Sequence, residues 1–291
     1  MVYVHFIINP VSGKAKHTIT QACLEAFFPK DYKIVTQYTN SKGHASQLAK
    51  SAVAQGADYI VACGGDGTIN EVASELVGTK VALGIVPVGS GNGLAGNLAI
   101  KKSIAEALET IAAGNTMCID IGQINDKYFF SNCGVGLDAA IIKNYEQNGR
   151  RTLISYIKAS LAAAFSYNYP KAIITYRQIK FEVKPLMLFV SNSNEMGYNM
   201  SLTPKASLQD GLLDFVIVPR LNVLYKSYMG LLVLLQKFQK FSPAKHMLVG
   251  GLKIEFPDKN TTDVQIDGEY HLFNTNSFAI TIQPGKLKVI V

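Results

Sequence analysis

The sequence lacks long apolar runs, and its few cysteines show no metal-binding or redox spacing. The longest apolar run, residues 229–235, is too short to cross a bilayer. Met1 leads directly into the apolar segment 2–8, without a charged leader or a cleavable stretch, so we do not expect secretion. The four cysteines form no CxxC pair and lie mostly in apolar segments. We therefore expect reduced, buried thiols in a cytosolic protein.

The basic excess is confined to one part of the chain. Of the 28 Lys/Arg and 21 Asp/Glu, nine of each fall in residues 1–121, so the formal charge of +7 belongs to residues 122–291. A basic half suits an anionic partner such as a membrane leaflet or a nucleic acid. It equally suits a soluble basic domain without such a partner. Because no recognisable nucleic-acid-binding motif accompanies the charge, we do not expect a nucleic-acid partner.

The chain is organised around the turn Gly64-Gly65-Asp66-Gly67-Thr68. This turn follows an unbroken apolar segment, which is typical of a buried parallel strand, and it precedes apolar residues at helical spacing. A strand, a glycine turn and a helix start together present backbone N–H groups to a phosphate. Asp66 would repel a phosphate unless a divalent cation or a reacting hydroxyl lay between them. A tight turn with a helix cap is the alternative interpretation.

Loops of a similar kind follow the other predicted strands of the first half. Asn9-Pro10-Val11-Ser12-Gly13 follows the first strand, Thr39 follows the second, and Pro87–Gly93, with Ser90 and Asn92, follows the fourth. Because strands and helices alternate here, we expect a Rossmann-like parallel sheet over residues 1–121. Ligands of such sheets bind beyond the carboxyl ends of the strands, where these loops would meet.

The composition changes near residue 121. A hairpin turning at Asn125-Asp126 and helices over about 139–165 precede a long series of β-type segments. Many strands with short turns predict an antiparallel β-sandwich over residues 122–291, with a final strand that could return to the first domain. The expected strands are 172–178, 180–191, 211–218, 247–256, 263–270, 277–283 and 286–291.

Two carboxylate-bearing glycine turns stand out in the second half, Asp210-Gly211-Leu212-Leu213-Asp214 and Asp267-Gly268-Glu269. Asp-Gly is common in hairpin turns, which is the alternative to a functional interpretation. Asp267 and Glu269 alternate with period 2, so we expect them to share one strand face. Two carboxylates on one face would suit a cation or a proton transfer.

A helix with apolar residues on several positions is expected near residues 221–238. It could lie on a membrane, but we favour packing against the sandwich. Lys226, Lys237 and Lys240 lie elsewhere on that helix. Its apolar positions are Leu221, Leu224, Tyr225, Tyr228, Leu231, Leu232, Leu235 and Phe238.

Taken in order, these motifs resemble the catalytic-domain family of diacylglycerol kinases and sphingosine kinases. No single motif is specific, but the full set spans nearly the whole chain. The matching motifs are Asn9-Pro10-x-Ser12-Gly13, Thr39 with Gly43-His44-Ala45, Gly64-Gly65-Asp66-Gly67-Thr68-x-Asn70-Glu71-Val72, Pro87-x-Gly89-Ser90-Gly91-Asn92, Gly136-x-Asp138-Ala139, Pro204-x-Ala206 before Asp210-Gly211-x-Leu213-Asp214, and Asp267-Gly268-Glu269.

The resemblance implies an ATP- and Mg²⁺-dependent lipid kinase with its nucleotide in a cleft between an α/β domain and a β-sandwich. Asp267 matches a proposed general base, and Asp66 a residue given that role in the sphingosine kinase branch. Asp138 matches a position that meets the substrate head group, and Asp210 lies in a segment that can hold a divalent ion. The implied nucleotide contacts are Asn9, Pro10, Ser12, Gly13, Thr39, Gly64, Gly65, Asp66, Gly67, Thr68, Gly89, Ser90, Gly91, Asn92 and Glu269.

We assign the role of general base to Asp267 and the binding of Mg²⁺ to Asp66, because a carboxylate engaged by a cation is a poor proton acceptor. The reverse assignment stays open.

Two positions depart from the family: Gly93 replaces a frequent acidic residue, and Gly96 replaces a usual arginine, whose charge Lys14 or Arg150 could supply. The expected protein is cytoplasmic and peripheral to the inner, anionic membrane face. The sequence is compatible with a homo-oligomer. An NAD kinase, whose family also has a GGDG turn, and a catalytically silent nucleotide- or lipid-binding protein are the alternatives.

Overall fold

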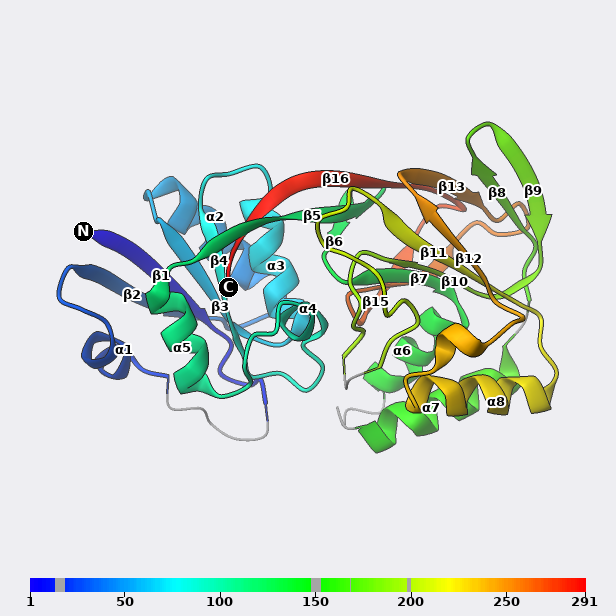
Figure 1. The fold of residues 1–291 in the computed structure, drawn as a ribbon, viewed down its shortest axis with the longest axis horizontal. Coiled ribbons are helices and arrows are strands. Elements are labelled where there is room, and N and C mark those ends of the chain that lie inside the picture. The colour runs from blue at the N-terminus through cyan, green and yellow to red at the C-terminus, as the bar shows by residue number, and fades with distance from the viewer. Residues whose placement is uncertain (14–18, 148–152, 168, 198–199) are drawn as a thin grey trace. The chain divides into compact units, whose positions relative to one another are not determined.

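A computed structural model describes residues 1–13, 19–147, 153–167, 169–197 and 200–291. The chain forms two compact units (Figure 1). The first joins Met1–Asp120 to Gly285–Val291, and the second is Ile121–Pro284. Lys14, Arg150 and the expected helix start at His17 lie outside the described residues.

The first unit is built on a parallel sheet with the strand order β2-β1-β3-β4. The end of β16 extends this sheet, with Val289 paired in parallel to Leu83 on β4. Strands β1, β3 and β4 are buried along almost their whole length, as their unbroken apolar sequences predict. The elements are β1 (Val2–Ile8), α1 (Gln21–Phe27), β2 (Tyr32–Tyr38), α2 (His44–Ala54), β3 (Tyr59–Gly64), α3 (Asp66–Leu76), β4 (Ala82–Pro87), α4 (Gly93–Asn97), α5 (Ile104–Ala113), the start of β5 (Thr116–Ile124) and the end of β16 (Ser277–Ile290).

The second unit contains an antiparallel sheet with the order β12-β11-β10-β7-β14-β15, and antiparallel strands β16, β13, β8 and β9. Its elements are β6 (Lys127–Phe129), β7 (Asn132–Gly136), α6 (Leu137–Gln147), α7 (Leu153–Ser166), β8 (Ala172–Tyr176), β9 (Ile179–Val183), β10 (Pro185–Ser191), β11 (Leu213–Pro219), α8 (Val223–Leu234), the short 3₁₀ helix η1 (Phe238–Lys240), β12 (Lys245–Val249), β13 (Gly251–Glu255), β14 (Thr262–Ile266) and β15 (Glu269–Phe273).

Two apolar layers hold the second unit together. In the first layer, the strands of the two groups face each other through one cluster that includes Val190, Phe215, Ile254 and Phe278. This arrangement is a β-sandwich. A second apolar cluster covers the opposite side of β10 and β11, where α6, α7 and α8 pack (Figure 1).

The fold class predicted from the sequence is confirmed: an α/β unit with parallel strands and an antiparallel β-sandwich. Several segment bounds were wrong. The expected strand 180–191 is two strands that meet before Pro185, and 247–256 is two strands separated by Gly250. Conversely, 277–283 and 286–291 belong to the single strand β16.

The expectation of buried cysteines was wrong for two of the four. Cys63 and Cys133 are buried, but Cys23 and Cys118 are exposed. All four are free thiols. The helix near residues 221–238 packs against the second unit, as favoured from the sequence, through the buried Leu221, Leu232 and Phe238. The other five expected apolar positions are exposed.

Candidate active site

The loops after β1, β3 and β4 are tied together by hydrogen bonds. The Asn9 backbone N–H donates to the Cys63 carbonyl over 2.9 Å, and its side-chain amide donates to Thr68 Oγ1 over 3.1 Å. The N–H groups of Val88 and Gly89 both donate to the Gly64 carbonyl. The structure therefore brings together three of the four predicted strand-end loops at one edge of the parallel sheet.

The glycines of these loops allow the loops to touch one another. A Cβ atom on Gly89 would lie 2.3 Å from the Gly65 Cα atom. Gly13 has a φ of +88°, and a Cβ atom there would lie 2.6 Å from the Val88 carbonyl oxygen. From the sequence, these glycines were explained only by the approach of a phosphate. Close packing between loops is a second requirement that the sequence did not indicate.

Asp66 links the start of α3 to the start of α4. Its two carboxylate oxygens accept the backbone N–H groups of Asn92 and Gly93, each over 2.7 Å. A carboxylate at a helix amino terminus is favoured by the unsatisfied N–H groups there. A Cβ atom on Gly91 would lie 2.6 Å from Asp66 Oδ2, so Gly91 also has to be small. Gly93, one of the two departures from the family pattern, is thus a direct partner of Asp66.

Asn92 has a buried acceptor beside this carboxylate. The residue is in the left-handed region, with a φ of 60°, and its side-chain N–H donates to the Gly89 carbonyl over 2.7 Å. Within the described part of the chain, Asn92 Oδ1 is buried and has no hydrogen-bond partner. A buried acceptor without a donor is costly, and ligand sites commonly contain such groups.

Other predicted nucleotide contacts are near these loops but are less constrained. Ser90 is exposed, Ser12 is half-buried, and the Ser12 N–H donates to the Asn9 carbonyl. Thr39 follows β2, and its N–H donates to the Ile8 carbonyl over 2.9 Å. Thr39 therefore lies at the same sheet edge, at the end of β1.

Glu71 has a structural role that the sequence analysis did not assign. Its carboxylate accepts the N–H groups of Gly43 and Ala45, over 2.7 and 3.1 Å. These donors belong to the start of α2, so Glu71 on α3 caps the neighbouring helix. The two partners are far apart in the sequence, and no local pattern could have revealed the pair.

In the second unit, Asp267 and Gly268 form the two-residue turn between β14 and β15. Their φ angles are 46° and 79°, both positive, as in the Asp-Gly hairpin turns that suit twisted strands. Ile266 pairs with Glu269 directly across the turn. The expectation that Asp267 and Glu269 share one strand face was therefore wrong, because a turn interrupts the period of two.

The Asp267 carboxylate points back into the unit and accepts three backbone N–H groups. Phe130 donates to Oδ2 over 2.9 Å, while Ser131 and Asn132 donate to Oδ1 over 2.8 and 3.0 Å. Asp267 is 7% exposed. These bonds fix the carboxylate against the segment that joins β6 to β7.

A buried polar cluster surrounds this turn. The Gln265 side chain donates to Asn132 Oδ1 over 2.7 Å and accepts the Gly268 N–H over 2.9 Å. Ser191 Oγ donates to the Ser193 carbonyl over 2.6 Å. The sequence analysis named none of these polar residues. Their isolated positions at strand ends carry no motif, and only strand pairing brings them together.

Asp138 lies on the first turn of α6 and is 3% exposed. Burial raises the pKa of Asp138 to about 7, although the Gln265 amide opposes the shift. A Cβ atom on Gly134 would lie 2.1 Å from Asp138 Oδ2, and that oxygen has no hydrogen-bond partner among the described residues. The predicted contact of Asp138 with a substrate head group remains a prediction.

The carboxylates of the 210–214 segment differ in environment. Asp210 is exposed, and its Oδ1 accepts the Leu212 N–H over 3.0 Å. Asp214 is buried and lies 2.5 Å from His246 Nε2, and burial raises the pKa of Asp214. Across the described ranges, no group of three or more His, Cys, Asp or Glu is placed to hold a metal ion. The metal role of Asp210 therefore remains a prediction.

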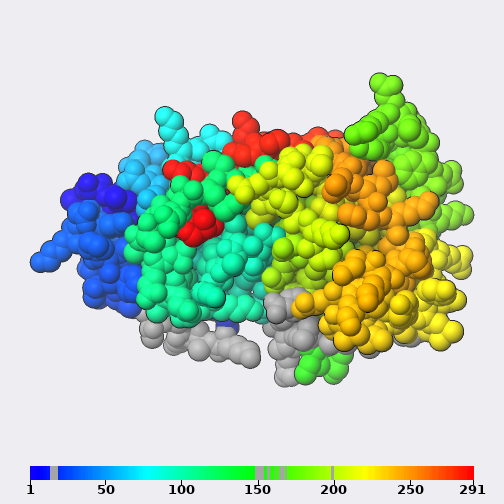
Figure 2. Space-filling view, in the orientation of Figure 1, coloured from blue at the N-terminus to red at the C-terminus, as the bar shows by residue number. Residues whose placement is uncertain are grey.

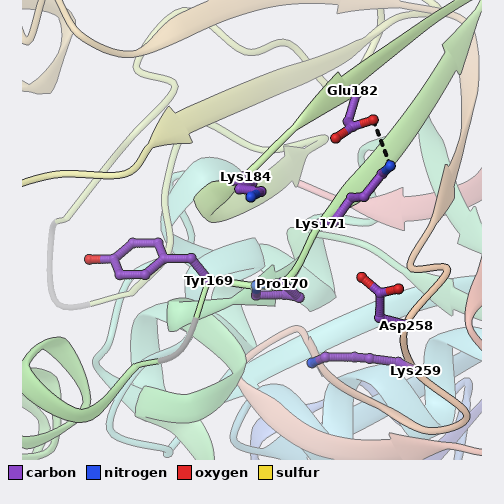
Figure 3. Close-up of a pocket in the computed structure, with 7 residues that line it drawn as sticks. All are labelled: Tyr169, Pro170, Lys171, Glu182, Lys184, Asp258 and Lys259. Atoms are coloured by element: carbon purple, nitrogen blue, oxygen red, sulfur yellow. Dashed lines mark ion pairs between the residues drawn. The ribbon is translucent and has the colours of Figure 1, made fainter.

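A cavity of about 480 Å³ in the second unit contains none of the motif residues (Figure 3). The Lys171 ammonium and the Glu182 carboxylate form an ion pair over 2.7 Å at this cavity. Its lining residues are Tyr169, Pro170, Lys171, Glu182, Lys184, Asp258 and Lys259. The strand-end loops contribute no residue to this cavity.

Comparison with known proteins identifies the class of this protein. Residues 3–124 match the diacylglycerol kinase catalytic domain, and residues 131–291 match the YegS C-terminal NAD kinase beta sandwich-like domain. The chain belongs to the diacylglycerol kinase catalytic-domain family. The prediction of a phosphotransferase of the lipid kinase family is thus confirmed, and a kinase of this family uses a nucleotide.

Individual relatives agree with this assignment. The chain is 31% identical to a diacylglycerol kinase of Bacillus subtilis, over 77% of this chain and 76% of that protein. It is 30% identical to a protein of Cronobacter sakazakii named "Probable lipid kinase YegS-like", over 71% of this chain and 72% of that protein.

Solved structures share the fold. A diacylglycerol kinase from Bacillus anthracis superimposes with a TM-score of 0.76 at 21% identity, covering 99% of this chain and 96% of that one. An NAD kinase from Archaeoglobus fulgidus in complex with ATP gives a TM-score of 0.55 at 11% identity, covering 99% and 93%. At these identities the likeness concerns the fold alone.

Proposed function

We propose that this protein transfers the γ-phosphoryl group of ATP, with Mg²⁺, to a hydroxyl group of a membrane lipid of the diacylglycerol or sphingoid type. The observation that carries the proposal is the joined set of loops after β1, β3 and β4, with Asp66 at its centre. Phosphoryl transfer depends mainly on positioned donors and on neutralised charge, and this edge of the sheet supplies groups for both.

The nucleotide phosphates are proposed to bind at the start of α3. The first backbone bond of this helix runs from the Ile69 N–H to the Gly65 carbonyl, so the N–H groups before Ile69 lie outside the helical ladder. Together with the helix dipole, such groups attract an anion. Asn9 and Thr68 fix the neighbouring loop through their side-chain bond. Thr39, Ser12 and Ser90 are further proposed contacts at the same edge.

The oxygen atoms at the start of α4 fit a Mg²⁺ ion. Each Asp66 oxygen accepts one backbone N–H, and in the described part of the chain the buried Asn92 Oδ1 is an additional oxygen without a hydrogen-bond donor. Mg²⁺ prefers such hard oxygen ligands. Asp66 and Asn92 would hold the ion, which when bound would neutralise charge on the phosphates.

Asp267 is the proposed general base. Its three backbone donors fix the orientation of the carboxylate, and a positioned acceptor is what proton abstraction requires. Glu269 is a proposed nucleotide or metal partner. Asp267→Asn should then lower kcat while ATP affinity changes little. If this variant instead binds ATP more weakly but still transfers the phosphoryl group fast in a single turnover, Asp66 would be the general base and Asp267 would act on the nucleotide or the metal.

A membrane lipid substrate requires contact with a membrane. The basic excess of residues 122–291 supports an anionic surface, and the proposal therefore includes a cytoplasmic protein peripheral to the inner membrane face. Asp138 is the proposed head-group contact, and Asp210 a proposed second metal-binding residue.

The test offers γ-labelled ATP and Mg²⁺ to the protein with diacylglycerol, a sphingoid base, undecaprenol or NAD. We expect label in one of the lipids, and the product identifies which. If only NAD becomes labelled, the protein is an NAD kinase and the proposal is wrong. Protein that binds ATP but labels no acceptor would be a catalytically silent member of the family.

A further inference from the structure

The helix α8 exposes most of its apolar side chains. Leu232 is buried, whereas Leu224 is 80% exposed and its apolar neighbours are about half exposed. Single exposed apolar residues are normal, but a contiguous set marks an interaction surface. The exposed apolar residues of α8 and its C-cap are Val223, Leu224, Tyr225, Tyr228, Leu231, Leu234 and Leu235.

These side chains form one face. At 3.6 residues per turn, all of them except Tyr225 fall within a sector of about 140°. The opposite sector contains Leu232, Met229 and Val233, which pack on the apolar cluster that covers β10 and β11. One side of α8 is therefore anchored to the second unit, and the other side, here called the α8 face, lies on the molecular surface (Figure 2).

The sequence around the α8 face is purely cationic. Residues 215–254 contain no Asp or Glu, but they contain Arg220, Lys226, Lys237, Lys240, Lys245 and Lys253. Lys237 and Lys240 are exposed. Arg220 and Lys226 lie over the Tyr169 ring, at 5.2 and 5.4 Å from its centroid, which places both cations beside the anchored side of α8.

The length of α8 decides how it can meet a bilayer. Its 12 residues span about 18 Å, well short of the roughly 30 Å hydrocarbon core. Among the described residues, no helix is long and apolar enough to cross a membrane. A short helix with one apolar face and flanking lysines suits the plane of the interface, where Tyr228 can present both a ring and a hydroxyl.

We propose that the α8 face is a membrane-docking surface, which inserts into the interface of an anionic lipid leaflet while the exposed Lys237 and Lys240 contact the head groups. This inference rests on the proposed function in one respect: a lipid kinase has to reach a substrate that lies in such a leaflet. Charge complementarity selects this occupant, since an acidic lipid surface matches an apolar face whose flanking sequence, residues 215–254, contains basic but no acidic residues.

The test measures co-sedimentation of the full chain with phosphatidylcholine vesicles, with and without phosphatidylglycerol, in the absence of ATP. The double variant Leu224→Gln, Leu231→Gln should lower the partition coefficient at least about tenfold, because two exposed leucines no longer enter the lipid. The matched control is Ile179→Gln, since Ile179 on β9 is 67% exposed and lies outside the α8 face. This control should bind vesicles like the unmodified protein.

The charge arm uses Lys237→Gln and Lys240→Gln. Each should reduce binding to anionic vesicles roughly fivefold, leave binding to neutral vesicles unchanged, and lose its effect at high salt. Lys80→Gln is the control, because Lys80 is an exposed lysine of the first unit. Equal binding by the double leucine variant and the unmodified protein would overturn the proposal.

Sedimentation velocity gives a second, independent outcome. A dimer that the leucine substitutions dissociate would show that a second copy covers the α8 face, and this too would overturn the proposal. Phosphorylation of lipid in detergent mixed micelles separates this inference from the proposed function. Kinase activity there without vesicle binding would refute only the docking surface, and vesicle binding without kinase activity would refute only the proposed function.

Discussion

Asp267→Asn is expected to destabilise the second unit as well as slow the reaction. Asparagine tolerates the left-handed backbone of this position, so the turn itself should persist. If the amide oxygen keeps the Ser131 and Asn132 donors, the amide nitrogen faces the Phe130 N–H, which is then buried without an acceptor. An unsatisfied buried donor costs about 1–3 kcal/mol, and two bonds that lose the carboxylate charge weaken by about 1 kcal/mol each.

The expected loss is therefore about 3–5 kcal/mol in the free energy of unfolding of this unit. Hydrogen exchange of the β6–β7 and β14–β15 backbone, together with the thermal midpoint, should report it, and the midpoint should fall by roughly 6–20 °C. Asp126→Asn is the matched control, since Asp126 is an exposed carboxylate on the β5–β6 turn. A midpoint within about one degree of the control would refute the claim that this carboxylate anchors the turn.

Further substitutions test other carboxylates. Burial raises the pKa of Asp138 from 3.8 to about 7, so between these pH values the folded state holds a proton that the unfolded state has released. The free energy of unfolding therefore falls as the pH rises through this window. In urea titrations, Asp138→Asn should have a higher free energy of unfolding than the unmodified protein above pH 7, and the same value near pH 4. Asp66→Asn should lower turnover about 10²-fold or more and alter its Mg²⁺ dependence, and near-normal turnover at saturating Mg²⁺ would remove Asp66 from the mechanism. Glu71→Gln should cost about 1 kcal/mol through the α2 cap while ATP affinity changes little, and unchanged hydrogen exchange at Gly43 and Ala45 would contradict that role.

The sequence was most informative where short-range patterns reflect burial and turn chemistry. Unbroken apolar segments predicted the parallel strands, and glycine turns after them predicted the loops that meet at their ends. Those loops are joined in the structure by Asn9, Thr68 and Asp66. The prediction that these loops meet is dependable, because parallel strands all end at the same edge of the sheet and the loops that follow them must lie at that edge.

The sequence was least informative where a role depends on distant partners. The period of two suggested that Asp267 and Glu269 share a face, but the turn chemistry of Asp-Gly decided the local structure instead. The Asp267 bonds reach segment 130–132, which strand pairing alone brings near. The exposure of a side chain is equally non-local. Apolar residues at helical spacing indicate that burying one helix face would be favourable, but they do not show whether another element packs on that face. For most of α8, none does in the described part of the chain.

The most direct test of a lipid kinase is the stoichiometry of one reaction. Protein, ATP and Mg²⁺ are mixed with diacylglycerol in detergent micelles, and ADP and phosphorylated lipid are quantified in the same sample. The proposed function predicts equal molar amounts of the two products, and about 10²-fold less phosphorylated lipid, or less still, when Asp66→Asn replaces the unmodified protein. ADP that forms without phosphorylated lipid, for this and for every other lipid acceptor offered, would contradict it.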